Sequence, residues 1–393
     1  MRTADAVIIG GGCMGASTAY HLARRGVTNL VLLERETQLA TGSTGRNAGG
    51  VRHQFSHPAN IELSKESIAL FGRFEEEVGS PIDFWQDGYL FVLSREASVD
   101  AFRANVALQR AHGVDVEWLD AAGAARRAPG LSVDDVLAAT WCAADGVADP
   151  NGVTMGFARA AQAAGATILR ETEATEVLHA SGRVTGVRTS RGDIEAPVVV
   201  NAAGPWAAGV GAMAGLEVPV SPERRHIFIA QPPGGGSWDD PGHAGRAPST
   251  RVLVIDFDTS FYFHREGTGL LFGMGDPDER PGFDTTVRWD FLPQVTEVAM
   301  RRLPALADAA ISRAWAGLYE MTPDHNPIIG ESDVLRGFFT IAGFSGHGFQ
   351  HAPAAGRILA DLVTGRDPAF DLAPFRPDRF ARGGGGAGEG NVV

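Results

Sequence analysis

The sequence predicts an α/β protein in which a discontinuous Rossmann-like domain is interrupted by an α+β domain built on an antiparallel sheet. Three glycine-rich turns, each preceded by a short apolar run, lie near the start, the middle and the end of the 393 residues. Hairpin-like and helical segments lie between these turns. This spacing is expected when one nucleotide-binding domain is interrupted twice, with a ligand pocket at the junction of the two domains.

The positions of these segments give the domain boundaries that we expect. The first domain comprises 1–80, 145–215 and 325–380, and the second comprises 81–144 and 216–324. The chain ends in GGGGAGEGNVV. This glycine-rich composition predicts a disordered tail at 381–393.

Composition and charge exclude several classes of function. Apolar residues make up 44% of the chain, and no window approaches the about 18 consecutive apolar residues of a membrane span. The net charge of −13 disfavours nucleic acid and anionic membranes as partners, but a local arginine can still bind a small anion. The first strand begins almost at once, which leaves no room for a signal peptide, so we expect a cytoplasmic location.

The cysteines and histidines predict no metal site. Cys13 and Cys142 are the two cysteines, too few for a disulfide framework or a four-cysteine metal site. His53, His57 and His325 show no metal-ligand spacing. We therefore expect both cysteines to pack in the interior.

The first glycine-rich turn has the spacing of a dinucleotide-binding motif. Apolar residues 7–9 precede Gly10-x-Gly12-x-x-Gly15, a helix-like segment follows, and a second apolar run ends at Glu34. Gly10 permits the tight turn, Gly12 lets the backbone approach a pyrophosphate, and Gly15 lets the helix pack on the strand. N–H groups at the helix start favour phosphate, and the Glu34 carboxylate suits a ribose but repels the 2′-phosphate of NADP. This turn alone fits NAD and FAD equally.

Further small-residue segments favour FAD. Residues 41–56, TGSTGRNAGGVRHQFS, are better explained by a backbone pressed against a ligand than by a flexible linker. Residues 201–204 would approach the pyrophosphate and ribityl chain through small side chains. The turn at 343–348 leads into a helix, whose N-terminal N–H groups would stabilise the negative charge of reduced flavin. Three separated turns are more than NAD needs.

Together these motifs resemble those of a known family. The segments GGGCMGASTAYHLARRG with Glu34, NAAGPW, TPDHNPIIG and AGFSGHGFQ are similar to the FAD-dependent amine oxidoreductases of the D-amino-acid-oxidase superfamily, over about residues 5–370. Within it, the chain most resembles the group of sarcosine oxidase, dimethylglycine dehydrogenase and the L-proline dehydrogenase beta subunit. The resemblance implies a small secondary or tertiary amino acid as substrate. A carbon next to nitrogen would give hydride to flavin N5, and the imine would hydrolyse.

The resemblance also implies which residues bind FAD, beginning with Gly10, Gly12, Gly15 and Glu34. Ser43, Val177 and Gly204 would lie further along the cofactor. The full set that we expect is Gly10, Gly12, Cys13, Met14, Gly15, Glu34, Arg35, Ser43, Thr44, Asn47, Ala48, Gly49, Val177, Ala203, Gly204, Trp206, Gly317, Gly343, Ser345, Gly346, His347, Gly348 and Gln350.

Several positions depart from the sarcosine oxidases. Where those enzymes carry a cysteine linked to flavin this chain has Gly317, so FAD is predicted to be non-covalent. The lysine that promotes reaction with oxygen is replaced by Leu271, so we expect a dehydrogenase rather than an oxidase. A second lysine, which assists carboxylate binding, is replaced by Gln350. The carboxylate-binding arginine is matched by Arg52, whose guanidinium suits a carboxylate in two-point contact, although a structural arginine is the alternative.

The other candidate catalytic residues are Tyr319, His347, Tyr262 and His264. His347 lies in the flavin-facing turn, where hydrogen bonding near the flavin and packing of the loop are both open. Tyr319 matches an active-site tyrosine, with a place in the core as the alternative. Tyr262 and His264 lie two residues apart on one predicted strand, so they share a face that would line the pocket.

Two further functions remain open from the sequence. One is an FAD-dependent 2-hydroxy-acid dehydrogenase, because the C–H bond of a 2-hydroxy acid is equally placed for hydride transfer to flavin. A flavin-bearing beta subunit, or an assembly protein of a larger redox complex, would need partner chains in a hetero-oligomer. The electron acceptor is not predicted.

Overall fold

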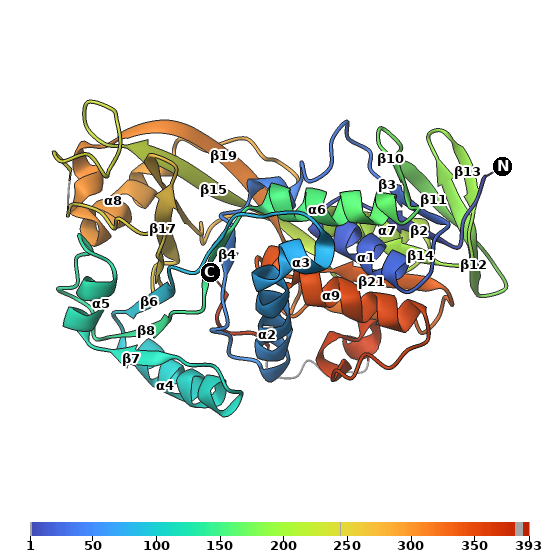
Figure 1. Ribbon diagram of the computed structural model, residues 1–393, viewed down its shortest axis with the longest axis horizontal. Helices are drawn as coiled ribbons and strands as arrows, with labels where there is room; N and C mark the ends of the chain where they lie inside the picture. The colour runs from blue at the N-terminus through green and yellow to red at the C-terminus, as the bar shows by residue number, and fades with distance from the viewer. Residues whose placement is uncertain (1, 244, 382–387, 393) are drawn as a thin grey trace.

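The computed structural model describes residues 2–243, 245–381 and 388–392, and within these ranges the strands form four sheets. Two larger sheets occupy opposite halves of an elongated molecule (Figure 1). One is mostly parallel and covered by helices, and the other is mostly antiparallel. The predicted fold class is therefore confirmed.

A six-stranded sheet forms the centre of the half that carries the N-terminus, on the right in Figure 1. Its neighbouring strands are parallel except at the edge, where β20 runs antiparallel to β21. In sheet order the strands are β10 (Thr167–Leu169), β3 (Leu30–Leu33), β2 (Ala6–Ile9), β14 (Val199–Asn201), β21 (Phe338–Ala342) and β20 (Ile328–Glu331).

Both faces of this sheet are covered, as its continuous apolar strands require. Ala6 and Ile8 face a core formed with helices, and Val7 and Ile9 face a second core on the opposite side. The helices are α1 (Cys13–Arg24), α6 (Pro150–Ala163) and α9 (Gly348–Val363), flanked by α2 (Pro58–Gly72) and α3 (Phe74–Val78). The opposite face is covered by α7 (Ala207–Met213) and by a four-stranded sheet of β1 (Arg2–Thr3), β13 (Gly192–Glu195), β12 (Arg183–Thr189) and β11 (Ala174–Ala180).

An eight-stranded sheet forms the other half of the molecule. Its strands pair antiparallel except where β16 runs parallel to β6. In sheet order they are β19 (Ala310–Met321), β15 (Ser221–Gln231), β18 (Gly269–Met274), β17 (Phe261–Glu266), β16 (Leu253–Asp256), β6 (Tyr89–Leu93), β8 (Ala138–Cys142) and β7 (Glu117–Leu119).

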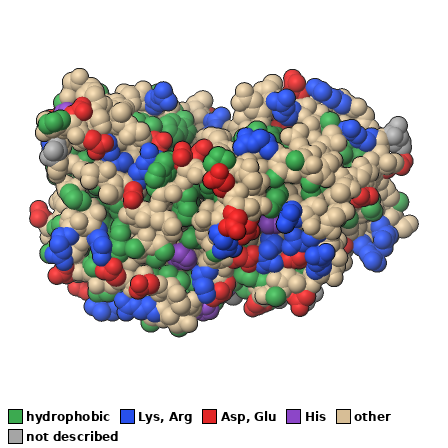
Figure 2. Space-filling view, viewed as in Figure 1, with side chains coloured by type: hydrophobic (Ala, Val, Ile, Leu, Met, Phe, Trp, Pro, Cys, Tyr) green, Lys and Arg blue, Asp and Glu red, His purple; other side chains and the backbone are tan. Residues whose placement is uncertain are grey.

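The two faces of the eight-stranded sheet differ in what they contact. Phe228, Phe263 and Phe272 belong to a core on one face, against α8 (Leu292–Arg302) and α5 (Ala121–Arg127), while α4 (Glu96–Ala111) packs beside β6 and β8. The other face carries Tyr262 and Tyr319 toward the nucleotide-binding half. In Figure 2 hydrophobic side chains gather over the left half and the middle of the visible surface, with charged side chains of both signs around them.

A small sheet joins the two halves. Its strands are β4 (Gly50–Val51), β9 (Gly146–Ala148) and β5 (Phe84–Trp85). All strands of the six-stranded sheet fall in the predicted first domain and all strands of the eight-stranded sheet fall in the second, while the small sheet takes strands from both. The boundaries between the domains stay a prediction.

Short 3₁₀ helices complete the described part of the chain: η1 (Ser43–Arg46), η2 (Gly204–Trp206), η3 (Pro304–Asp308), η4 (Ala373–Phe375) and η5 (Pro377–Arg379).

The predicted disordered tail needs correction. Residues 388–392 pack against the molecule, and the exposed fractions of Glu389 and Asn391 are 1% and 2%. Figure 1 places the C-terminus in the middle of the molecule, beside β4. The prediction is wrong for 388–392 because tertiary hydrogen-bond partners hold this glycine-containing segment. The remainder of the predicted tail at 382–387 and 393 lies outside the described residues.

A buried ion pair ties α8 to the eight-stranded sheet. The Arg302 side chain is 1% exposed and donates to the Asp256 carboxylate from Nε at 3.0 Å and from Nη2 at 2.8 Å. It also donates to Asp135 at 2.7 Å and to the Ser132 carbonyl at 3.0 Å. Because Asp256 is equally buried, its charge depends on this arginine for compensation.

We expect Arg302→Met to lower the free energy of unfolding by about 3–5 kcal/mol, because it leaves a buried carboxylate without its counter-ion. The matched control is Arg301→Met on the exposed side of the same helix, which should change stability by about 0.5 kcal/mol or less. Urea unfolding of the three proteins measures both values. Equal midpoints for the two variants would contradict this role of Arg302.

Candidate functional site

A continuous cavity of about 630 Å³ lies between the six-stranded and eight-stranded sheets. One end is built from backbone turns of the nucleotide-binding half: the β2–α1 turn, the end of β3, η1 and η2. The other end is lined by side chains from β6, β15, β16, β17 and β19. The cavity thus joins a polar backbone cradle to a largely aromatic and aliphatic chamber.

The β2–α1 turn positions a helix N-terminus on the cavity wall. Gly10 has φ +115°, and a Cβ atom there would lie 2.3 Å from the Ala202 carbonyl oxygen. A Cβ atom on Gly15 would lie 1.9 Å from the Gly10 carbonyl oxygen, so α1 packs on its own preceding turn. The first turn of α1 has no acidic side chain and no side-chain cap at Gly12. Its dipole therefore favours an anion on the cavity wall, although the Cys13 N–H donates to the Thr44 hydroxyl at 3.1 Å.

Glu34 closes the far end of this cradle at the end of β3. Its carboxylate accepts hydrogen bonds from the backbone N–H groups of Gly11 at 3.0 Å and Glu36 at 2.9 Å. These bonds fix the carboxylate on the cavity wall as an acceptor. Trp206 lies on the same wall, with the Arg35 guanidinium 4.1 Å from the centre of its ring.

Glu320 is an acidic side chain in the cradle that the sequence reasoning missed. Ideal Cβ atoms on Gly204 and Gly348 would lie 3.6 and 3.4 Å from its two carboxylate oxygens, so the carboxyl group lies between two of the glycine turns. Its Oε2 atom is buried and has no hydrogen-bond partner among the described residues. Burial raises the pKa of Glu320 to about 7, although the N–H groups of Gly343 and Phe344 act in the opposite direction.

The cradle therefore fits FAD on structural grounds. It offers a helix N-terminus for a pyrophosphate, a ribose acceptor at Glu34, and an unpartnered buried oxygen at Glu320 for a hydroxyl donor. The close backbone approach of Gly10 to Ala202 brings two small-residue segments together on the cavity wall. The only signal for Glu320 in the sequence was a single acidic residue between Tyr319 and Met321.

The chamber end contains three tyrosines and two arginines, Arg52 and Arg225. Tyr89, Tyr262 and Tyr319 all line the cavity, and burial raises the pKa of each hydroxyl, so these groups are neutral donors and acceptors. Arg225 lies 4.8 Å from the centre of the Tyr319 ring. Aliphatic side chains, among them Leu253 and Ile255, complete the wall.

Arg52 lines the chamber but is engaged by its own chain. Its Nη1 and Nη2 atoms donate to the carbonyl oxygens of Gln54 and Asn391, and its guanidinium lies 3.9 Å from the centre of the Phe55 ring. Its backbone N–H donates to Oε1 of Gln350 at 2.7 Å. Gln350 thus orients the Arg52 backbone, a role that the sequence reasoning did not foresee. Substrate carboxylate binding by Arg52 stays a prediction.

His347 lines the cavity, but both of its ring nitrogens have protein partners. Nε2 lies 3.1 Å from the His325 carbonyl oxygen, and Nδ1 lies 3.2 Å from Nδ1 of His351. Nε2 of His351 in turn lies 2.8 Å from the Ser64 hydroxyl. Burial lowers the pKa of His347 to about 4, so its ring is neutral. The hydrogen-bonded series His347–His351–Ser64 holds the turn in place. This geometry favours the loop-packing alternative for the His347 side chain.

His264 requires a correction. Its ring nitrogens lie 2.7 Å from the Arg265 carbonyl oxygen and 2.9 Å from the Ala48 carbonyl oxygen, and the side chain is not part of the cavity wall. Tyr262, on the same strand, does reach the cavity. His264 therefore anchors the 47–50 segment to β17 instead of lining the chamber. Leu271, its partner across β17 and β18, is buried and also lies outside the wall.

Most of the predicted cofactor residues lie on the cavity wall. These are Gly10, Gly12, Cys13, Met14, Glu34, Arg35, Ser43, Thr44, Asn47, Ala48, Ala203, Gly204, Trp206, Gly317, Ser345, Gly346, His347, Gly348 and Gln350. Four predicted residues lie behind it. Gly15, Gly49 and Gly343 pack against neighbouring chain segments, and Val177 lies in the core between the six-stranded and four-stranded sheets, because β11 covers the sheet face. The individual contacts to FAD stay predictions.

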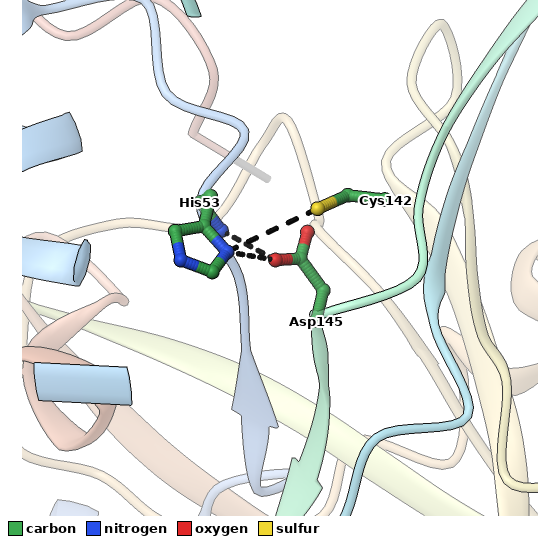
Figure 3. A group of neighbouring side chains, drawn as sticks. All are labelled: His53, Cys142 and Asp145. Carbon is green, nitrogen blue, oxygen red and sulfur yellow. Dashed lines mark hydrogen bonds and ion pairs between the residues drawn. The ribbon is translucent and has the colours of Figure 1, made fainter. Parts of the chain in front are cut away.

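A buried trio beside Arg52 was also missed, because its members are far apart in sequence. Figure 3 shows His53, Cys142 and Asp145 pointing toward one another. The His53 Nδ1 atom lies 2.6 Å from Oδ1 of Asp145 and 3.9 Å from the Cys142 sulfur. The backbone N–H of His53 also donates to Asp145, at 2.8 Å. These residue types can ligate a metal ion, but the carboxylate is already satisfied by hydrogen bonds that hold the 52–54 segment.

Comparisons with known proteins agree with this geometry. The profile of the FAD dependent oxidoreductase family matches residues 5–362. The chain belongs to this family. FAD is therefore its cofactor, and none of the described helices is long and apolar enough to cross a membrane.

Individual members of the FAD-dependent oxidoreductase family are similar over nearly the whole chain. Human mitochondrial sarcosine dehydrogenase is 32% identical to this chain. The similar region covers 96% of this chain and 41% of that protein. Sarcosine oxidase subunit beta of Rhizobium meliloti is 30% identical, with 96% of this chain and 89% of that subunit covered. The crystal structure of L-proline dehydrogenase from P. horikoshii superposes with a TM-score of 0.88 at 35% identity, over 97% of this chain and 99% of that one.

The raised pKa of Glu320 has a consequence for stability. Because the folded chain holds this proton up to about pH 7 and an unfolded glutamate releases it near pH 4.3, the carboxyl group makes stability fall as pH rises through this window. We expect Glu320→Gln to remove this loss, so the variant gains melting temperature relative to the parent between pH 5 and pH 8. Thermal unfolding of the FAD-free proteins measures this.

The matched control for Glu320 is Glu297→Gln, which changes an exposed glutamate on α8. It should leave the pH dependence of the melting temperature unchanged. The same pH dependence in Glu320→Gln and the parent would show that Glu320 ionises normally in the folded protein.

Proposed function

We propose that the chain oxidises the C–N bond of a small secondary or tertiary amino acid, such as sarcosine, dimethylglycine or proline. The observation that carries this proposal is the continuity of the FAD cradle with a chamber that contains Arg52. The names of the relatives support the same substrate class. This chain spans 41% of the length of human sarcosine dehydrogenase. The activity and partners proposed here are therefore those of this chain and are not taken from that whole protein.

Different residues of the chamber would bind different groups of the substrate. FAD bound in the cradle would supply the two-electron acceptor. The Arg52 guanidinium would bind the substrate carboxylate, since a charged donor pair favours a carboxylate over a neutral group. The neutral hydroxyls of Tyr262 and Tyr319 would orient the amine, and Leu253 and Ile255 would exclude water from it.

Two properties of the bound state are part of the proposal. Gly317 lines the cavity and has no side chain that can bond to flavin, which supports non-covalent FAD. Leu271 in place of a lysine supports a dehydrogenase, since no cation at that position would stabilise developing superoxide. A cytoplasmic location also remains proposed.

An anaerobic flavin-reduction screen tests the substrate class. We expect sarcosine, dimethylglycine or L-proline to bleach the flavin absorbance, and lactate and glycolate to leave it unchanged. Reduction by the hydroxy acids alone would instead establish the 2-hydroxy-acid dehydrogenase. Arg52→Ala should weaken productive binding by about 1.5–3 kcal/mol, the range for a hydrogen bond to a charged group.

Reoxidation after the same reduction tests the choice of acceptor. When air is admitted to the reduced protein, we expect the flavin spectrum to return slowly, whereas an artificial acceptor should restore it at once. Rapid formation of hydrogen peroxide would contradict the inference from Leu271.

A second candidate is a flavin-bearing beta subunit of a hetero-oligomer. It is favoured by the near-complete coverage of the Rhizobium meliloti sarcosine oxidase subunit beta. Turnover by the lone chain with an artificial acceptor would count against a need for partners. Stable association with other subunits after purification from its source would support it.

A further inference from the structure

Residues 388–392 form a short segment, which we call the strap, that reaches the cavity at Val392. Glu389 and Asn391 are buried, and Val392 lies on the cavity wall. The backbone of Glu389 is held at both ends: its N–H donates to the Asp324 carbonyl at 3.0 Å, and its carbonyl oxygen lies 3.3 Å from Nδ1 of His325. The strap is therefore bound to the protein by specific contacts.

The outer end of the strap is fastened by the Glu389 carboxylate. It accepts hydrogen bonds from the backbone N–H groups of Ser56 at 2.8 Å and His57 at 3.1 Å, from the Ser56 hydroxyl at 2.6 Å, and from Nδ2 of Asn60 at 3.0 Å. These donors surround the N-terminus of α2, where negative charge is favoured. Although burial acts to raise the pKa of Glu389, the hydrogen bonds from Ser56 and Asn60 and the charge of Arg52 lower it.

The inner end of the strap is held by Arg52. The guanidinium donates to the Asn391 carbonyl oxygen, while the Asn391 side chain donates to the Gln54 carbonyl at 3.1 Å and accepts from Asn105 at 3.0 Å. Asn105 belongs to α4, so this end bridges the two halves of the molecule. The strap thus occupies one donor of the arginine that faces the chamber.

The contacts at the two ends of the strap differ in how easily a ligand can replace them. Glu389 carries a full negative charge and accepts hydrogen bonds from five donors, including the Asn391 N–H at 2.9 Å. The Asn391 carbonyl is a neutral acceptor on a cationic donor. A carboxylate forms a stronger, charge-assisted hydrogen bond with a guanidinium than a carbonyl does. A ligand carboxylate in the chamber would therefore compete with Asn391 for Arg52 and leave Glu389 fastened.

We propose that the strap is a gate at the chamber end, and that a substrate carboxylate opens its inner end by replacing the Asn391 carbonyl on Arg52. This inference rests on the proposed function only in requiring a ligand with a carboxylate, which amino acids and hydroxy acids share. Arg52 then has two successive partners, the strap in the free protein and the ligand in the complex.

Hydrogen–deuterium exchange of the FAD-loaded protein tests the gate without turnover. We expect acetate to speed amide exchange at the inner end of the strap, Asn391 and Val392, by about tenfold, which corresponds to losing one hydrogen bond to a charged group. Neutral acetamide, of similar size, should have no effect. Exchange that acetate leaves unchanged or slows, or an absence of acetate binding in the flavin spectrum, would overturn the proposal.

Two variants test whether the strap controls entry. Glu389→Gln removes the charge that fastens the outer end, so 388–392 should exchange faster without ligand and acetate should associate several-fold faster. Glu297→Gln on the exposed side of α8 is the matched control and should change neither rate. A chain ending at residue 387 removes the strap outright and should associate with acetate at least as fast as Glu389→Gln. Unchanged association rates in both strap variants would overturn the gate.

These outcomes are independent of the proposed reaction. If amino acids fail to reduce the flavin but acetate still loosens the strap, the substrate class is wrong and the gate stands. If amino acids reduce the flavin but the strap does not respond to carboxylates, the reaction stands and the gate is wrong.

Discussion

The close contact of two backbone segments behind the cavity constrains the rest of the structure. Gly10 and Ala202 come so near that a Cβ atom on Gly10 would lie 2.3 Å from the Ala202 carbonyl oxygen, and α1 packs equally closely on the turn at Gly15. The contact lies at the carboxyl ends of β2 and β14, which are neighbouring strands in the middle of the parallel sheet. The N-terminus of α1 and the small residues of η2 consequently face the same cavity. The eight-stranded sheet then closes this opening from the other side.

Charge is distributed along the cavity in a way that suits its two ends. In the cradle, the Glu34 carboxylate accepts from backbone donors, and the Glu320 carboxyl group has a raised pKa. The chamber has neutral tyrosines beside two arginines, the buried Arg52 and Arg225. Arg52 is compensated by nearby Glu389 and Asp145 and by the carbonyl oxygens that it contacts. A buried cation with exchangeable carbonyl partners is a suitable receptor for an incoming carboxylate.

The sequence predicted the cradle well because its determinants are local. The β2–α1–β3 unit follows from an apolar run, three glycines at fixed spacing and an acidic residue, all within 34 positions. The chamber depends on contacts between distant segments, such as the parallel pairing of β16 with β6, which no local pattern specifies. His264 illustrates the difference, since strand alternation gave the correct face but could not show that Ala48 would occupy its ring nitrogen.

The tail was mispredicted for the same reason. Its glycine content indicates a chain with little intrinsic order, and the donors that hold Glu389 come from residues more than 300 positions away. Glu320 was missed because its role depends on which polar atoms remain unpaired after folding. The hydrogen bond from the Arg52 backbone to Gln350 was missed for the same reason.

The central claim is that one continuous cavity holds FAD in the cradle with its redox end toward Arg52. A crystal structure of the protein with FAD bound tests it most directly. We expect the adenosine beside Glu34, the pyrophosphate at the start of α1 and the isoalloxazine ring between the 346–350 turn and Tyr262. FAD bound in the reverse direction, or outside this cavity, would contradict it.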